Sequence, residues 1–150
     1  MISAMNLGRL LSDTARLDPD EIGLIHGEQS WTWAELDTRA NAFRDALHTL
    51  DVKKGDRVLV QSRNSRELIE SLWGIFKAGC VWVPANFRLT PPEIAYLAEN
   101  SGARAFLFEH EFCRHAEAAK SASVGLQHLI VAEGSHDGAV TYDELGAAHK

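Results

Sequence analysis

Hydrophobic residues along this chain follow two alternating patterns, which predict helices and short strands in turn. Apolar positions recur three and four residues apart in five segments, a spacing typical of helices that bury one face or more. These helices are expected over residues 7–17, 33–50, 66–78, 91–100 and 111–121. Short apolar runs rich in β-branched or aromatic residues predict strands over 57–61, 81–83, 105–109 and 128–132. This alternation predicts an α/β fold, with a mostly parallel sheet and helices on both faces.

The two ends of the chain carry weaker patterns. Residues 22–26 and 29–31 flank Gly27 and Glu28, and this spacing predicts an antiparallel hairpin. A loop is expected over 134–138, followed by a helix that begins at Tyr142 and runs to Lys150. Because no apolar element follows to cover that helix, residues 1–150 are interpreted as part of a domain.

Local signals define where several helices begin and end. A threonine is followed three residues later by a glutamate at three helix starts, which predicts capping boxes. These pairs are Thr32 with Glu35, Thr90 with Glu93, and Thr141 with Glu144. Gly79 follows the apolar helix 66–78, where a left-handed residue is expected to end it.

Composition limits the possible settings and partners. With 150 residues, 45% hydrophobic and 24% charged, the chain is expected to be soluble and globular. The net charge of -6 argues against nucleic acid and anionic membranes as partners. Cys80 and Cys113 form no CxxC pair, and no segment resembles a targeting sequence or membrane span, so a cytoplasmic location is predicted. The oligomeric state stays open, a homodimer included.

Familiar catalytic and metal-binding motifs do not account for the polar clusters. His110 and His115 are five residues apart, whereas a helical HExxH site needs four, so no metal ligand is predicted. The helix 111–121 is instead expected to be solvated, with Cys113 half-buried. No G-x-S-x-G elbow, GxxxxGK[ST] loop or GxGxxG loop occurs, and no catalytic residue is predicted. The four tryptophans are expected to pack in the core.

Arg88 is the one candidate binding residue. It follows the strand 81–83, and open α/β sheets gather ligands beyond the carboxyl ends of their strands. A guanidinium there can hold a phosphate in a fork. The alternative is a structural ion pair with a carboxylate such as Glu93, and both interpretations stay open.

Several ordered motifs resemble those of one family. Residues 76–94 read FKAGCVWVPANFRLTPPEI, residues 30–36 read SWTWAEL, and residues 54–58 read KGDRV. Together they resemble the start of the acyl-CoA synthetases, the acid:CoA ligases of the adenylate-forming (AMP-binding) superfamily. The related adenylation domains of peptide synthetases typically read VP-x-D-P-x-Y-P where this chain has VPANFRL. Asp51 departs from the glycine that the family often has between helix and strand.

The resemblance implies that the chain is the first part of the large N-terminal domain of an adenylate-forming enzyme. The family's phosphate loop, acyl pocket and C-terminal lobe with its catalytic lysine have no counterpart within residues 1–150. The complete enzyme would use ATP, Mg²⁺ and CoA to convert a carboxylic acid, of the fatty-acid type, into an acyl-adenylate and then a thioester. The resemblance places Arg88 against the nucleotide phosphate of CoA.

These 150 residues alone are predicted to be inactive and to bind none of those cofactors tightly. The alternatives are a portion of another adenylate-forming enzyme, and a stand-alone binding or assembly module.

Overall fold

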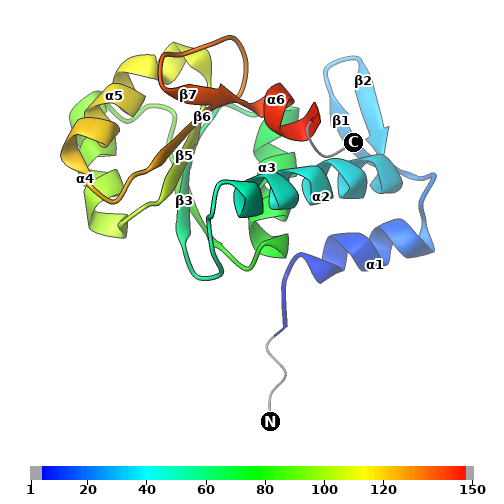
Figure 1. Cartoon of the computed structure of the whole chain (residues 1–150). Coiled ribbons are helices and arrows are strands. Elements are labelled where there is room, and N and C mark those ends of the chain that lie inside the picture. Colours follow the sequence, from blue (N-terminus) through cyan, green and yellow to red (C-terminus); the bar gives the residue numbers. More distant parts are fainter. Residues whose placement is uncertain (1–4, 148–150) are drawn as a thin grey trace.

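A five-stranded parallel sheet forms the centre of this computed structural model, which describes residues 5–147 (Figure 1). The strand order is β4-β3-β5-β6-β7, and every neighbouring pair is parallel. The strands are β3 (Arg57–Gln61), β4 (Val81–Ala85), β5 (Ala105–Phe108), β6 (His128–Val131) and β7 (Ala139–Thr141). The predicted α/β class is confirmed.

Helices cover both faces of the sheet, as the strand pattern requires. One face packs against α2 (Trp33–Thr49), α3 (Arg66–Lys77) and α6 (Tyr142–Ala147). The other packs against α4 (Pro91–Ser101) and α5 (Cys113–Ala122). In β3, Val58 and Val60 join the first core whereas Leu59 joins the second. Strands covered on both sides are apolar throughout, which explains why the central strands show no polar alternation.

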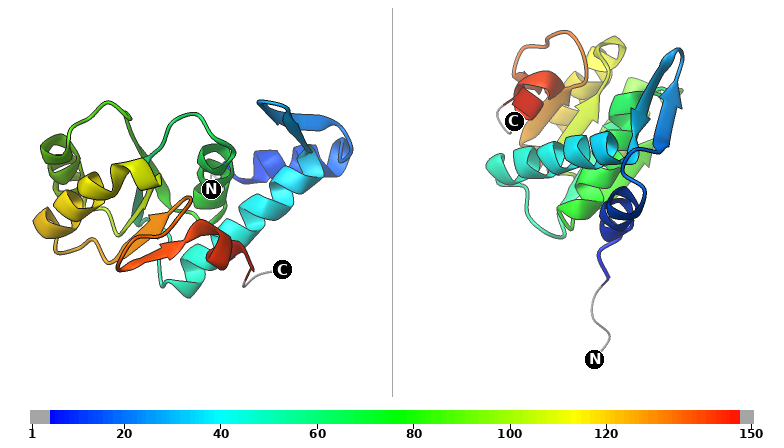
Figure 2. Two further views of the ribbon diagram at one scale, coloured as in Figure 1. Left: turned by 90° about the horizontal axis from the view of Figure 1, so that it is seen from above. Right: turned by 90° about the vertical axis from the view of Figure 1, so that its right-hand side faces the viewer.

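A third layer lies at the end of α2 remote from α4 and α5 (Figure 2). It contains α1 (Arg9–Leu17) and the antiparallel hairpin of β1 (Ile22–His26) and β2 (Gln29–Thr32). Leu11, Leu36 and Ala40 form its small core, against which Trp33 and Trp73 pack half-buried. The hairpin prediction is confirmed.

The remaining tryptophans are also half-buried. Trp82 packs against the first core, which agrees with the prediction. Trp31 instead carries the guanidinium of Arg66 over its ring, 5.5 Å from the ring centroid. Core packing therefore describes Trp33, Trp73 and Trp82 better than Trp31.

The predicted helix starts have the expected contacts. Thr32 and Thr141 each accept a hydrogen bond from the N–H three residues on, at 3.2 Å, and the glutamate there accepts from the threonine N–H. At the third start, Glu93 accepts from the N–H of Thr90 at 2.7 Å and from its hydroxyl at 2.8 Å. These bonds lower the pKa of the Glu93 carboxyl.

Besides shifts of one or two residues at the ends of other elements, three features differ from the predicted ones. The strand β7 (Ala139–Thr141) lies between the loop predicted over 134–138 and the helix predicted from Tyr142, and no strand is predicted there because three residues are too few to show a period of two. β4 continues through Pro84 to Ala85, since proline, which lacks an N–H, is tolerated in an edge strand. The helix expected from residue 111 opens as a 3₁₀ turn, η1 (His110–Phe112), before α5. Residues 148–150 of the last predicted helix lie outside the described residues.

Left-handed residues end α2 and α3 in the same way. Gly79 has φ +72°, and the N–H of Cys80 donates to the carbonyl of Ile75 at 3.0 Å. Asp51 takes the matching position after α2 with φ +57°, and the N–H of Val52 donates to the carbonyl of Leu47 at 2.9 Å. The prediction of a left-handed stop at Gly79 is confirmed.

Replacing Asp51 with glycine is expected to raise the free energy of unfolding by about 0.5 kcal/mol. Glycine removes a left-handed cost of roughly 1 kcal/mol, reduced here because aspartate tolerates this geometry. The carboxylate lost is 68% exposed and lies 3.4 Å from Lys53 and 3.6 Å from Arg104, and such solvent-accessible pairs contribute little. Urea unfolding measures the change. Asp51→Asn, which removes only the charge, should be close to neutral, and equal gains in both variants would assign the effect to charge instead.

Candidate functional site

The loops beyond the carboxyl ends of β3, β4 and β5 meet at one edge of the sheet. Because neighbouring strands are parallel and in register, residues 62–65, 86–90 and 109–111 all follow the strands on that side. This edge is where open α/β sheets place ligands. It also holds Arg88, the predicted binding residue.

Residues 86–90, called the elbow below, connect β4 to α4 and are held by hydrogen bonds from within and from outside. The amide oxygen of Asn86 accepts from the N–H of Arg88 at 2.9 Å. Gln61, fully buried at the end of β3, donates its Nε2 to the carbonyl of Asn86 at 3.3 Å. His115 on α5 contacts the carbonyl of Leu89 at 2.9 Å, and since a carbonyl only accepts, Nε2 carries the proton. Two other elements therefore hold the elbow's backbone.

Arg88 is exposed and extends from this held backbone. Its guanidinium carbon lies 5.2 Å from the centroid of the Phe87 ring, within the range of a cation–π contact. Within residues 5–147 it makes no ion pair, and Glu93 is engaged by Thr90 instead. The alternative of a structural Arg88–Glu93 pair is not what the structure contains.

A second guanidinium contacts the same ring from the loop after β3. The guanidinium carbon of Arg63 lies 4.8 Å from the Phe87 centroid. Arg63 also binds Glu111 in two places, Nε to Oε1 at 2.6 Å and Nη2 to Oε2 at 3.3 Å. The hydrogen bond from Arg63 lowers the pKa of Glu111, and the carboxylate in turn raises the pKa of Arg63.

Glu109 closes the base of this loop. It accepts hydrogen bonds from the hydroxyl of Ser62 and, at 2.8 Å, from the N–H of Arg63. Ser65 caps α3 by accepting from the N–H of Leu68 at 3.1 Å. The serines therefore have structural roles, and the loop after β3 is fixed beside the elbow.

The residues His110, Cys113 and His115, for which no metal ion is predicted, lie in separate surroundings. His115 contacts the elbow, Cys113 is half-buried at the start of α5, and His110 begins η1. Residues 5–147 contain no group of three or more His, Cys, Asp or Glu side chains that could hold a metal ion. Burial raises the pKa of the Cys113 thiol, which therefore stays protonated at neutral pH.

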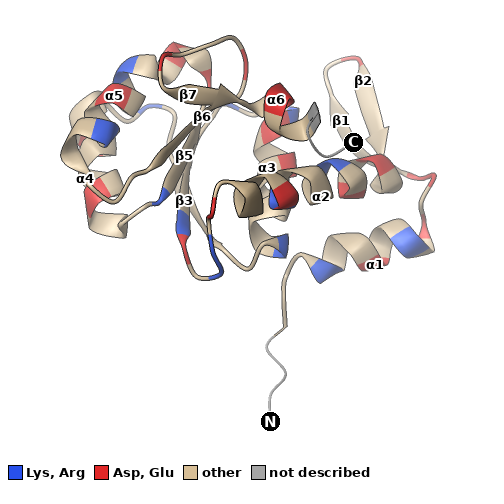
Figure 3. Ribbon diagram, in the orientation of Figure 1, with Lys and Arg blue, Asp and Glu red and all other residues tan. Residues whose placement is uncertain are grey.

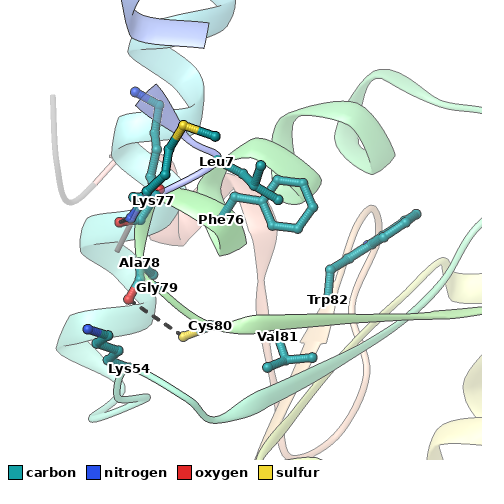
Figure 4. Close-up of a pocket in the computed structure, with 11 residues that line it drawn as sticks. Leu7, Lys54, Phe76, Lys77, Ala78, Gly79, Cys80, Val81 and Trp82 are labelled. Atoms are coloured by element: carbon teal, nitrogen blue, oxygen red, sulfur yellow. Dashed lines mark hydrogen bonds between the residues drawn. The ribbon is translucent and has the colours of Figure 1, made fainter. Parts of the chain in front are cut away.

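A hollow of about 620 Å³ lies at the other end of the sheet, near the start of β4 (Figure 4). Its walls are mostly apolar and include Leu7, Phe76 and Trp82. Burial raises the pKa of Cys80 to about 11, so its thiol is no nucleophile at neutral pH. Lys77 is engaged by Asp37 at 2.7 Å. The hollow brings no reactive groups together.

Charge and hydropathy add two further observations. Lys and Arg lie interspersed with Asp and Glu along the ribbon (Figure 3). Among the described helices, none is long and apolar enough to cross a lipid bilayer.

The sequence pattern indicated Arg88 but not the residues that contact the elbow around it. Gln61 carried a weak signal, as a polar residue at the end of an apolar strand. Arg63 and His115 carried no such signal, because their partners are distant in the sequence. Arg63 lies 24 residues before Phe87, and His115 lies 26 residues after Leu89.

Comparisons with known proteins identify the family. The sequence pattern of the family described as "AMP-binding enzyme" matches residues 11–149, so the chain belongs to that family. A medium/long-chain-fatty-acid–CoA/3-oxocholest-4-en-26-oate–CoA ligase of Mycobacterium marinum is 34% identical over 112 residues, which are 75% of this chain and 20% of that protein. A feruloyl-CoA synthase of Amycolatopsis is 34% identical over 74% of this chain and 22% of its own length.

Solved structures agree with this assignment. The anthranilate CoA ligase AuaEII, crystallised with anthranoyl-AMP, superimposes with a TM-score of 0.91 at 25% identity, over 97% of this chain and 28% of that one. The resemblance of motifs and fold to adenylate-forming acid:CoA ligases is thereby confirmed. The matches to the two curated relatives span about a fifth of each relative's length.

Proposed function

We propose that this chain is the first part of the large N-terminal domain of an ATP-dependent acid:CoA ligase that acts on a fatty acid. Family membership supports the general reaction, and the elbow sequence supports a CoA ligase over other adenylate-forming enzymes. The name of the Mycobacterium marinum relative supports a fatty acid as substrate.

The proposed reaction has two steps. A carboxylate oxygen of the acid attacks the α-phosphorus of ATP, and the bond to the β-phosphate oxygen breaks, releasing pyrophosphate. The CoA thiol then loses its proton and attacks the acyl carbon, and AMP leaves with the electron pair of the broken acyl–oxygen bond.

The main support for a role of this segment in binding is that the guanidinium of Arg88 has no carboxylate partner among the described residues, while hydrogen bonds from Gln61 and His115 fix the backbone of its elbow. An arginine without a carboxylate partner is available to a phosphate, and its planar fork matches phosphate oxygens. We infer that Arg88 binds the nucleotide phosphate of CoA.

The complete reading frame containing this sequence provides the test of the activity. Its product should release pyrophosphate when given ATP, Mg²⁺ and a fatty acid, and should form the CoA thioester. The 150-residue chain should do neither. Adenylate formation without thioester would favour another adenylate-forming enzyme. A natural stop after Lys150 would favour a stand-alone module.

Arg88→Gln in the complete ligase is expected to raise the KM for CoA by roughly ten- to a hundredfold, because a hydrogen bond to a charged group contributes about 1.5–3 kcal/mol. Acid-dependent exchange of pyrophosphate into ATP, which needs no CoA, should stay near the wild-type rate. Arg16→Gln, an equal charge change on α1 (73% exposed), is the matched control. An unchanged KM for CoA, or equal loss in both half-reactions, would contradict the assignment.

A further inference from the structure

The Phe87 ring is contacted by two guanidiniums that differ in their other partners. Arg63 has its carbon 4.8 Å from the ring centroid and is bound by both oxygens of Glu111. Arg88 has its carbon 5.2 Å from the same centroid and has no carboxylate partner within residues 5–147. Since Glu111 already neutralises Arg63, Arg63 brings little net attraction for an anion.

What Arg63 adds is a fixed contact to the ring. It comes from the loop after β3, whose backbone Glu109 holds through the Arg63 N–H at 2.8 Å. Phe87 is half-buried and packs at the edge of the second core. A free arginine side chain loses rotamer entropy on binding, and a ring that already restricts the side chain reduces that cost.

We propose that Arg63 is a positioning residue, which holds the Phe87 ring so that the ring in turn orients the Arg88 guanidinium toward an anionic phosphate. Glu111 fixes Arg63 for this role through its two hydrogen bonds. The inference rests on the proposed phosphate-binding role of Arg88.

The orientation of Arg88 is measured without any ligand by NMR of this chain. The ring current should move the chemical shifts of Arg88 side-chain protons that lie over Phe87 upfield. The Phe87→Leu variant gives the reference chemical shifts in the absence of the ring. Arg63→Gln should move these protons toward the Phe87→Leu value, whereas Arg16→Gln should leave them unchanged. Arg88 shifts that stay at their wild-type values in Arg63→Gln would overturn the proposal. Arg63 is 56% exposed in its side chain, so the variant is expected to fold.

Glu111→Gln separates positioning from simple electrostatics, because the two predict opposite changes in the affinity for an anionic phosphate. Removing a carboxylate beside an anion site strengthens anion binding if charge alone matters, or if a freed Arg63 binds the phosphate itself. Positioning predicts about threefold weaker binding, because the ring contact loosens. The probe is adenosine 3′,5′-bisphosphate, titrated at low salt and followed through the amide shifts of residues 86–90. Tighter binding in Glu111→Gln would overturn the proposal.

Failure of the inference can be told from failure of the proposed function. If Arg88→Gln weakens binding of the bisphosphate but Arg63→Gln does not, Arg88 remains the phosphate ligand and the positioning role is wrong. If Arg88→Gln leaves binding unchanged, or the wild-type amides of residues 86–90 show no shift that depends on bisphosphate concentration, the phosphate-binding role of Arg88 fails. The ring-shift comparison still decides whether Arg63 orients Arg88.

Discussion

Replacing Glu70 with alanine is expected to lower the free energy of unfolding by about 3 kcal/mol, because it leaves the buried Tyr142 hydroxyl and the partly exposed guanidiniums of Arg39 and Arg66 without their shared partner. Glu70 on α3 is fully buried. One oxygen binds Arg39 of α2 and lies 3.2 Å from Arg66 Nε, and the other accepts from the hydroxyl of Tyr142 at 3.2 Å. Three helices therefore share this carboxylate.

Urea unfolding followed by tryptophan fluorescence measures the loss, and hydrogen exchange locates it. The amides of α6 should lose protection first, since Tyr142 links that helix to Glu70. Glu67→Ala is the matched control: the same residue type on the same helix, paired with Arg66 at 2.6 Å but 24% exposed. It should cost about 1 kcal/mol or less. Equal losses in the two variants would show that the shared contacts of Glu70 contribute nothing specific.

The same carboxylate gives the stability a predictable pH dependence. Burial raises the pKa of Glu70 above its ordinary 4.5, and the guanidiniums of Arg39 and Arg66 offset this only in part. The folded state therefore holds the proton to higher pH than the unfolded state, and this contribution to stability falls as the pH rises from 4.5 through the folded pKa. Glu70→Gln should remove that slope, which urea titrations between pH 4.5 and 7 would detect.

Replacing Phe106 with alanine is expected to cost about 3–5 kcal/mol through the cavity it leaves. Phe106 on β5 is fully buried in the core beneath α4 and α5, with its ring centroid 5.3 Å from that of Phe108. Because β5 is central in the sheet, neighbouring strands restrict collapse around the missing ring. The midpoint of thermal unfolding should fall by roughly 10 °C for a domain of this size.

Tyr96→Ala is the control for this second prediction. Tyr96 is an aromatic residue of α4 that is 67% exposed, so its removal should change stability by about 0.5 kcal/mol or less. Differential scanning calorimetry of the three proteins checks both values. A Phe106→Ala midpoint within about 2 °C of the Tyr96→Ala midpoint would contradict the assignment of Phe106 to an essential core position.

Most of the helices and central strands followed from local patterns. The apolar runs of β3, β5 and β6, and the threonine–glutamate starts of α2 and α6, each depend on residues within one short segment. The three-residue β7 was missed, because Val140 pairs with Ile130 through tertiary contacts that no local period encodes. The continuation of β4 past Pro84 to Ala85 likewise depends on its position at the sheet edge.

The sequence by itself determined the family motifs and the α/β class and indicated Arg88 as a candidate binding residue, because these depend on residue type and spacing along the chain. Only the tertiary structure decided what surrounds that arginine. Gln61, Arg63 and His115 reach the elbow from separate elements, and Glu70 is shared by helices whose contacts span up to 72 residues. Such contacts arise when parallel strands bring their carboxyl ends together and helices pack across the sheet. The local spacing of residues along the chain does not predict them.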